Sequence, residues 1–382
     1  MSDTEFYVWR LTYMPDKVYP EFFDRAKFSV KSSGSPSAST AGLYAYKPNS
    51  FDSSSLRSDF LYDQRNKVIH MNSLECRVVS NPGKDWGERD CTKEETRSGF
   101  ARLPRIIPGV GGGGDTMYEI SGNDLVALTE PANIPGYGLS WSGATKTAYR
   151  MPTGFPGESG EIIGYDVFSP SSQGKDAAWA CVIARGGDGK KHLLSAALDS
   201  LTPDQSPAVP GLTPVLELPS DAESVTVDPD GTYVWIGGTQ ALYRLHLKSG
   251  GVIENYAIKM AEPRASIRFW SEGKNNVWAV VPDVPGDIHL LAVHGSTQEK
   301  HPVINCGDST SLQRPLGGIV SDIRDSDGRA LIYRHRSVDL TATPHVLDVD
   351  LKGREAVRSV DLPSKAWPNQ GFTWYYCPGW TL

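Results

Sequence analysis

The ionisable residues that could bind a metal form two short groups, and neither has the spacing of a metal site. His289 and His294 lie five residues apart in IHLLAVH, so a strand would place them on opposite faces. The segment SDIRDSDGR holds Asp322, Asp325 and Asp327 but lacks the downstream Glu of a calcium-binding loop. We therefore expect no metal, and we predict a hairpin turn within residues 321–329.

Motifs for nucleophiles and cofactors are also missing from the sequence. No H-E-x-x-H, no G-x-S-x-G and no dinucleotide-binding glycine pattern occurs. The Gly-rich run IIPGVGGGGDT (106–116) does not match a phosphate-binding loop, and it suggests a lid or a close approach of the backbone. No organic cofactor is expected, so any chemistry is expected to come from acid and base side chains.

The bulk composition excludes several classes of partner. The 382 residues carry a formal net charge of −7 and a sequence pI of about 5.7, which argues against a surface for the nucleic-acid backbone. No run reaches the roughly 18 apolar residues of a membrane span, and the N-terminus does not resemble a secretory signal. The five cysteines are widely spaced without a C-x-x-C pair, as expected for free thiols in a reducing compartment. We predict a cytoplasmic protein that binds a small molecule, no nucleic acid and no membrane.

Short strands and tight turns dominate the chain. Segments such as SVTVDPDGTYVWIGG (224–238) and RALIYRHRS (329–337) alternate apolar and polar residues next to D-G turns, which is typical of hairpins. Strands that leave a small-residue turn begin at four places, near Gly138, Ser224, Ala265 and Gly317. The last three lie 41 and 52 residues apart, a spacing typical of propeller blades. The sequence predicts an all-β protein, a β-propeller with six blades preferred and seven possible.

The two ends of the chain differ from the blade region. Residues 1–40 include the polar run KSSGSPSAST (31–40), so we predict an irregular N-terminal extension and polar loop there, followed by a single propeller domain over residues 41–382. The segment GFTWYYCPGW (371–380) is expected to be a strand that closes the ring with N-terminal residues. The segment DAAWACVIAR (176–185) is a candidate start for an additional blade.

Three segments resemble one group of propellers. The segment IPGYGLSWSGATKTAYRMP (134–152) is similar to the motif P-N-G-L-x-W-S-x-D-G-x-T-x-Y-x-x-D, and GEIIGYDV (160–167) is similar to the strand that follows it. Later passages at 223–238 and 261–280 resemble further family segments in the same order. Over about residues 134–281 the chain thus resembles the senescence-marker-protein/gluconolactonase and strictosidine-synthase-like propellers. The residues that match the first motif are Gly138, Leu139, Trp141, Ser142, Lys146, Thr147 and Tyr149.

The metal residues of that motif are replaced in this chain. Tyr137 stands where the family has Asn before Gly-Leu, and Pro152 stands where it has a metal-ligating Asp. A proline side chain cannot bind a hard cation, which needs several oxygen ligands. Asn133 would substitute only if the loop changed its geometry. Metal-dependent lactone hydrolysis is therefore the second interpretation of the function.

The strictosidine-synthase branch implies metal-free catalysis by a glutamate in the central cavity. Aligning VTVDPDG with the family places Glu223 at the acidic position, and a carboxylate in an aromatic-lined pore would have a raised pKa. We predict Glu223 as general acid or base, with Arg268 or Tyr137 stabilising the developing charge. The predicted function is cofactor-independent cyclisation, intramolecular addition or isomerisation of an aromatic or polyketide-like specialised metabolite. The predicted substrate-binding residues are Ser140, Trp141, Ser266 and Trp270.

Each candidate residue also has a purely structural interpretation. Glu223 would then be a solvated loop acid, Arg268 a surface arginine, and the tryptophans would pack between blades. A third interpretation of the whole chain is a non-enzymatic propeller that binds a protein or a ligand. The blades are poorly repetitive, which argues against a multivalent lectin.

Overall fold

The structure of the chain is a computed structural model in which strands and turns make up most of the described part. It describes residues 4–13, 20–30, 37–39, 60–63, 68–71, 105–107, 116–121, 124–130, 132–134, 138–140, 144–150, 161–169, 178–198, 213–247, 253–261, 263, 267–273, 276–284, 286–296, 299–306, 316–336, 345–361 and 376–380.

The first three sheets are built from the N-terminal strands and the last strand of the chain. Sheet 1 has the order β28-β1-β2-β3, sheet 2 the order β5-β4-β10-β9, and sheet 3 the order β6-β7-β8-β11, with antiparallel pairing throughout. Their strands are β1 (Thr4–Tyr13), β2 (Pro20–Val30), β3 (Ser37–Ser39), β4 (Phe60–Asp63), β5 (Val68–Met71), β6 (Arg105–Ile107), β7 (Thr116–Ser121), β8 (Asp124–Thr129), β9 (Ala132–Ile134), β10 (Gly138–Ser140), β11 (Thr145–Arg150) and β28 (Tyr376–Trp380).

The other four sheets follow the chain order. Sheet 4 is β12-β13-β14-β15, sheet 5 is β16-β17-β18-β19, sheet 6 is β20-β21-β22-β23 and sheet 7 is β24-β25-β26-β27. Their strands are β12 (Glu161–Phe168), β13 (Trp179–Arg185), β14 (Lys191–Ala197), β15 (Thr213–Leu218), β16 (Ala222–Val227), β17 (Tyr233–Gly238), β18 (Leu242–His246), β19 (Glu254–Tyr256), β20 (Arg268–Glu272), β21 (Asn276–Pro282), β22 (Ile288–Ala292), β23 (Val303–Ile304), β24 (Leu316–Arg324), β25 (Arg329–Arg336), β26 (His345–Asp350) and β27 (Glu355–Asp361).

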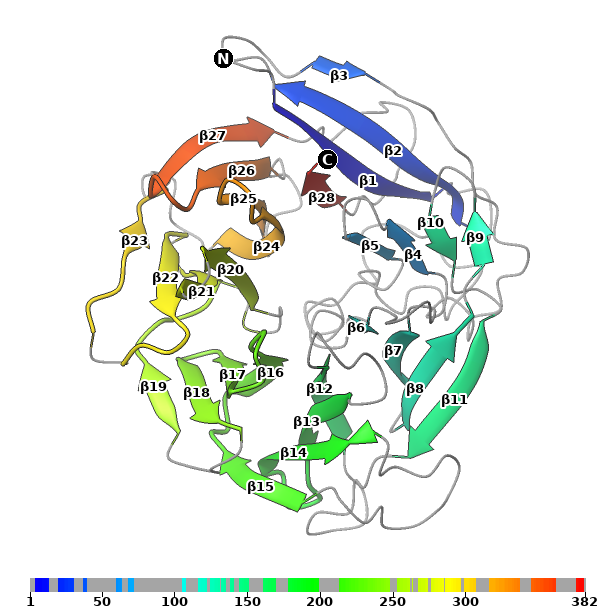
Figure 1. Cartoon of the computed structure of the whole chain (residues 1–382), viewed down its shortest axis with the longest axis vertical. Helices are drawn as coiled ribbons and strands as arrows, with labels where there is room; N and C mark the ends of the chain where they lie inside the picture. Colours follow the sequence, from blue (N-terminus) through cyan, green and yellow to red (C-terminus); the bar gives the residue numbers. More distant parts are fainter. Residues whose placement is uncertain are drawn as a thin grey trace.

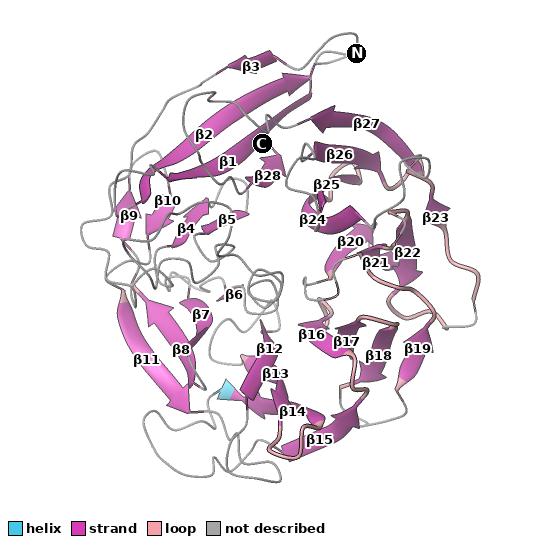
Figure 2. Ribbon diagram, turned by 180° about the vertical axis from the view of Figure 1, so that it is seen from behind, coloured by secondary structure: helices cyan, strands magenta, loops and turns pink. Residues whose placement is uncertain are grey.

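The sheets follow one another around a ring, each with one strand nearest the centre (Figure 1). Contacts between these innermost strands join β28 to β5, β6 to β12, β12 to β16, β20 to β24 and β24 to β28. The view from behind shows the same ring, with β28 beside β1 (Figure 2). The described residues therefore form a β-propeller with seven four-stranded sheets.

Antiparallel pairing places particular strand ends on the same side of the ring. The first residue of β16, Ala222, pairs with Gly238 at the end of β17. Ser224 donates a hydrogen bond to the carbonyl of Pro263, which precedes β20, and Gly318 of β24 lies against Pro282 at the end of β21. We call this side, where β12, β16, β20 and β24 begin, the start face. The opposite side, where these strands end, is the end face.

The hydrophobic core lies between neighbouring sheets rather than at one centre. Four apolar clusters occupy the successive boundaries from sheet 3 to sheet 7. Because such sheets are covered on both sides, β13 has five consecutive buried residues in WACVIAR. Each fully buried Val, Leu or Ile contributes about 1.5–3 kcal/mol relative to an exposed one, so these boundaries hold the ring together.

The ends of the chain confirm one prediction and revise another. The C-terminal strand β28 pairs with β1 over Phe6–Arg10, so the predicted ring closure is confirmed. Residues 1–40 were expected to be irregular, but they contain β1, β2 and β3. The pairing of β1 with β28 joins residues more than 360 positions apart, so the local pattern of residues 1–40 does not show that β1 is a strand.

The number and boundaries of the sheets also differ from the preferred prediction. Seven sheets are formed, which is the number given beside the preferred six. Between Gly138 and the start of β16 only one new sheet begins, at β12, and the additional sheets use strands before Gly138. The segment DAAWACVIAR supplies β13, the second strand of sheet 4, instead of starting a sheet.

Candidate functional site

Glu223 lies at a β-bulge near the start of β16. The register against β17 shifts between Ala222 and Ser224, so Glu223 is the extra residue of the bulge, a position that re-aims a side chain. Its Oε1 lies 3.6 Å from the Nζ of Lys191, the first residue of β14, and the two side chains are 15% and 6% exposed. The carboxylate predicted to be catalytic is thus turned toward the neighbouring sheet and paired there.

Lys191 is held between sheets 4 and 5 by two groups. Its Nζ donates a hydrogen bond of 2.6 Å to the carbonyl oxygen of Ala222, beside the ion pair with Glu223. Burial lowers the pKa of Lys191, while the Glu223 carboxylate acts in the opposite direction. Removing one partner of such a pair would leave a buried charge uncompensated, so the pair has a clear role in joining the sheets.

The other predicted site residues are not gathered into one place. Arg268 is exposed at the first residue of β20, on the start face. Trp270 is 3% exposed in the cluster between sheets 6 and 7, against Gly328, which favours its packing interpretation over substrate binding. Ser140 ends β10 in sheet 2, and sheets 3 and 4 separate it from Glu223. Outside the described residues lie Tyr137, Trp141 and Ser266.

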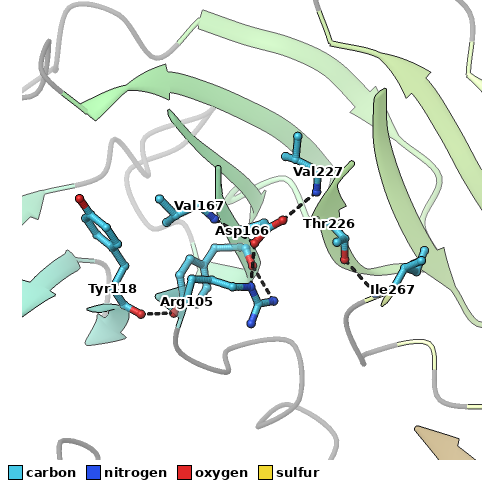
Figure 3. Close-up of polar contacts among 8 residues, drawn as sticks. Arg105, Tyr118, Asp166, Val167, Thr226, Val227 and Ile267 are labelled. Carbon is cyan, nitrogen blue, oxygen red and sulfur yellow. Dashed lines mark hydrogen bonds and ion pairs between the residues drawn. The ribbon is translucent and has the colours of Figure 1, made fainter. Parts of the chain in front are cut away.

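Polar side chains on the innermost strands join consecutive sheets (Figure 3). Asp166 of β12 accepts hydrogen bonds of 2.7 Å from the Nε of Arg105 in β6 and from the backbone N–H of Val227 in β16. The Oγ1 of Thr226 accepts the backbone N–H of Ile267, just before β20, at 3.0 Å. We call these contacts latch bonds, because each ties one innermost strand to the next.

A chain of three hydrogen-bonded ionisable side chains lies at the start face of sheet 6. Asp283 follows β21, His289 is the second residue of β22, and His301 precedes β23. The Nε2 of His289 lies 2.7 Å from the Oδ2 of Asp283, and its Nδ1 lies 2.8 Å from the Nε2 of His301. The side chains of His289 and Asp283 are 14% and 15% exposed. We call this group the Asp–His–His relay.

The hydrogen bonds of the relay determine which ring nitrogens carry protons. The Asp283 carboxylate can only accept, so when His289 is neutral its ring proton lies on Nε2 and its lone pair on Nδ1. In that tautomer His301 donates from Nε2, which leaves a lone pair on its Nδ1. In the described part of the chain this nitrogen has no hydrogen-bond partner. It also does not belong to the fully buried polar atoms without a partner. The nitrogen is therefore not fully buried, and its lone pair can take up a proton.

The charges of the relay are set by burial and by local donors. The backbone N–H groups of Gly286 and Asp287 donate to the Oδ1 of Asp283 at 2.9 and 2.7 Å. Burial by itself raises the pKa of Asp283, but these bonds and the one from His289 outweigh it and lower the pKa below its usual value. Burial, and then the neighbouring His289, lower the pKa of His301. At neutral pH the terminal ring is therefore a neutral base.

Sequence reasoning missed the relay because it compared His289 with His294. His294 lies beyond the end of β22 on the end face, where its Nε2 is 3.0 Å from the Oδ2 of Asp230. His301 comes near His289 because Val303 pairs with His289 across β22 and β23. That register, which the local pattern does not contain, was the missing signal.

The described residues contain no group of three or more His, Cys, Asp or Glu side chains placed to hold a metal ion. In the part of the chain that the structure describes, no helix is long and apolar enough to cross a membrane.

The class of protein defined by these sheets is the β-propeller. The chain is also similar to several solved structures. The chain matches Kuenenia stuttgartiensis hydrazine synthase with 11% identity and a TM-score of 0.33, covering 49% of this chain and 47% of that one. A TolB-type protein from Agrobacterium tumefaciens matches with 14% identity and a TM-score of 0.36, over 72% and 90%. BBS1N, solved in complex with ARL6DN, matches with 8% identity and a TM-score of 0.40, over 89% and 78%. Nothing about activity follows from similarities at this level.

No family model and no curated protein matches the chain. The resemblance to gluconolactonase-like and strictosidine-synthase-like propellers is therefore supported only as far as the propeller fold. The two strands of its first motif also lie in different sheets. Gly138–Ser140 (β10) pairs with β4 and β9 in sheet 2, whereas Thr145–Arg150 (β11) pairs with β8 at the outer edge of sheet 3.

Proposed function

We propose that this propeller is a small-molecule enzyme that transfers protons at the Asp–His–His relay without a metal or an organic cofactor. One observation carries the proposal. The relay begins at a carboxylate fixed by two backbone N–H groups and ends at a ring nitrogen that is not fully buried and has no hydrogen-bond partner among the described residues. A site of this kind can take up a proton and stabilise the positive charge that results.

Each member of the relay has a distinct task in such a step. His301 acts as the general base, because its Nδ1 holds the free lone pair. When this ring becomes an imidazolium, its Nε2–H bond to His289 strengthens, as charge-assisted hydrogen bonds do. Asp283 keeps His289 in the required tautomer and supplies the opposite charge, so it is a positioning residue.

The reaction we propose is proton removal next to a carbonyl group, followed by isomerisation, addition or cyclisation of an aromatic or polyketide-like substrate. Arg268 supports this reaction class by its position. It pairs with Val280 in β21, three residues before Asp283, and lies on the same face of the ring as the relay. An arginine there would stabilise a developing enolate. Glu223, paired with Lys191, then serves the boundary between sheets 4 and 5.

The test is exchange of the α-protons of an aryl ketone in D₂O, followed by NMR. His301→Gln is expected to lower the exchange rate by about 10²-fold or more, the usual contribution of a general base. Asp283→Asn is expected to lower the rate by about tenfold through the wrong tautomer of His289, with little effect on KM. His294→Gln is the matched control, because that exposed histidine lies outside the relay. An unchanged rate in His301→Gln would refute the proposal.

The pH dependence of the exchange is a second readout of the same proposal. Because the pKa of His301 lies below the ordinary value of about 6.5, the base is already free at neutral pH. The rate is therefore expected to stay level above pH 7 and to fall only in acid. Chelating agents are expected to leave it unchanged, whereas a metal-dependent lactone hydrolase would lose its activity.

A non-enzymatic interaction propeller is the second candidate. The latch bonds favour it, because they use polar side chains of the innermost strands to join sheets and leave them no role in catalysis. If the wild type and His301→Gln exchange the ketone protons at the same rate, affinity capture with the intact chain is the next experiment. A partner that is lost on Arg268→Glu, at the exposed start face, would support this candidate.

A further inference from the structure

We infer that His301 is also an acyl-accepting nucleophile and that the relay hydrolyses small, activated acyl esters. The inference rests on the proposed function in one respect, since it uses the same basic nitrogen. It adds a covalent step and a substrate class. The Nε2 of His301 donates to the His289 ring. The Nδ1 of His301 can therefore bond to a carbon atom while the proton on Nε2 passes to His289.

The first half of the reaction forms the acyl-enzyme. The lone pair of the His301 Nδ1 bonds to the ester carbonyl carbon, and the carbonyl π electrons move to oxygen. The tetrahedral intermediate then collapses, which breaks the bond to the leaving group and releases it with the electron pair. The acylated ring passes its Nε2 proton to the Nδ1 of His289, 2.8 Å away. His289 becomes an imidazolium beside the Asp283 carboxylate.

The second half restores the relay. Water adds its oxygen to the acyl carbon, the bond between that carbon and His301 breaks, and the electron pair returns to Nδ1. The proton held by His289 goes back to the Nε2 of His301, and the second proton of water neutralises the leaving group. The sum is ester plus water giving carboxylic acid plus alcohol. No metal, oxidant or further reactant is needed.

The chemistry of the nucleophile selects the substrate class. A neutral imidazole is a modest nucleophile, and it expels only leaving groups of low basicity, such as phenolates. Aryl esters therefore fit the site, whereas amides and simple alkyl esters do not. Val303, which pairs with His289, is 48% exposed and leaves an uncovered apolar side chain on the strand next to the relay. An aryl group has apolar surface to bury in contact with it.

The experiment uses 4-nitrophenyl acetate with the full chain. Release of nitrophenolate is followed by absorbance, and acid-quenched samples are digested and analysed by mass spectrometry. We expect an acetyl group on the peptide that contains His301, and we expect hydroxylamine to remove it. His301→Gln should abolish the adduct and lower the release rate by about 10²-fold. His294→Gln should behave as the wild type.

Two further variants separate a relay from a lone histidine. His289→Gln and Asp283→Asn are expected to keep KM and to lower kcat, and His289→Gln is expected to move the acid limb of the pH profile. A merely structural role would change neither limb of that profile. Circular dichroism and denaturation curves show whether each variant is folded, and Asp283→Asn remains a test if His301→Gln does not fold.

The outcomes distinguish this inference from the proposed function. Ketone exchange that depends on His301, without an acetyl adduct on it, keeps the general base and overturns the acyl step. An adduct only on lysine or another residue also overturns it. If the wild type shows neither ketone exchange nor ester hydrolysis above the background rate, both the inference and the proposed function are overturned. A hydroxylamine-labile adduct on His301 that requires His289 supports the inference.

Discussion

Asp166 and Asp283 are two shielded carboxylates with different surroundings. Both accept short hydrogen bonds from backbone N–H groups and from one cationic or ring donor. The donors to Asp166 include the Arg105 guanidinium and the backbone N–H of Val227. Neither of these donors has a lone pair that could take up a further proton. For Asp283 the ring donor is His289, which is itself bonded to the open His301.

The difference shows how a latch and a site are distinguished. Burial and short hydrogen bonds occur in both groups, so neither property identifies function. The distinguishing feature is where the chain of hydrogen bonds ends. A series of hydrogen bonds that ends at a backbone group, or at a side chain whose polar atoms are all paired, stabilises the structure. A series that ends at a nitrogen with a lone pair can accept a proton.

The largest expected effect concerns the Asp166 latch. Asp166→Ala leaves the Arg105 guanidinium and the N–H groups of Val167 and Val227 without their acceptor. We expect it to lower the free energy of unfolding by about 3–5 kcal/mol, the usual cost of removing one partner of a buried pair. Urea denaturation measures the loss, and ketone exchange per folded molecule should be unchanged. A loss below that of Asp283→Ala would reverse the comparison.

Asp228 on the end face offers an intermediate case. It is fully buried at the turn after β16, where the N–H groups of Thr232 and Tyr233 donate to it at 2.8 and 3.0 Å. Burial, and then the hydrogen bond and charge of Asp230, raise the pKa of Asp228 to about 7. Unlike Asp166, this carboxyl group has no cationic partner among the contacts described, and its nearest ionisable neighbour is another acid.

The raised pKa of Asp228 predicts a pH-dependent stability. An unfolded Asp has a pKa of about 3.9, so between about pH 4 and pH 7 the folded protein binds more protons than the unfolded chain. The contribution of Asp228 to the free energy of unfolding therefore falls as the pH rises through that range. Asp228→Asn removes this titration. We expect the stability advantage of the wild type over the variant to shrink by about 2 kcal/mol from pH 5 to pH 7.

Urea denaturation of both proteins at several pH values checks the Asp228 prediction. Asp230→Asn is the matched second variant, since it removes the neighbouring acid and should lessen the pH dependence of the wild type. A wild-type advantage that grows with pH would mean that Asp228 is stabilised as a charge, in the manner of Asp166.

Much of the fold could be predicted because its signals are local. Turns such as Asp228-Pro-Asp-Gly231 and the hairpins after them recur along the second half of the chain, and predicted starts near Ser224, Ala265 and Gly317 lie within three residues of the starts of β16, β20 and β24. Alternating strands with tight turns indicate the all-β class directly. These features depend on neighbours in sequence and so are readable from it.

The remaining features depend on pairing between distant segments. Sheet 1 joins β28 to β1, and sheet 2 joins β10 to β4, so neither follows from a hairpin pattern. The same reason explains why the surroundings of Glu223 could not be predicted. Glu223 was placed by alignment, whereas its bulge and its pairing with Lys191 depend on two sheets. His301 joins the relay only through the register of β22 and β23.

The smallest expected effect concerns the neutral latch at Thr226. Thr226→Val keeps the shape of the side chain but leaves the buried N–H of Ile267 without its acceptor, which should cost about 1 kcal/mol in the free energy of unfolding. Thr226→Ser keeps the hydroxyl group and should lose less. Amide hydrogen exchange at Ile267, together with urea denaturation, measures both effects. If Ser and Val destabilise equally, the Oγ1 bond is not what joins β16 to the start of β20, and only charged contacts such as that of Asp166 act as latches.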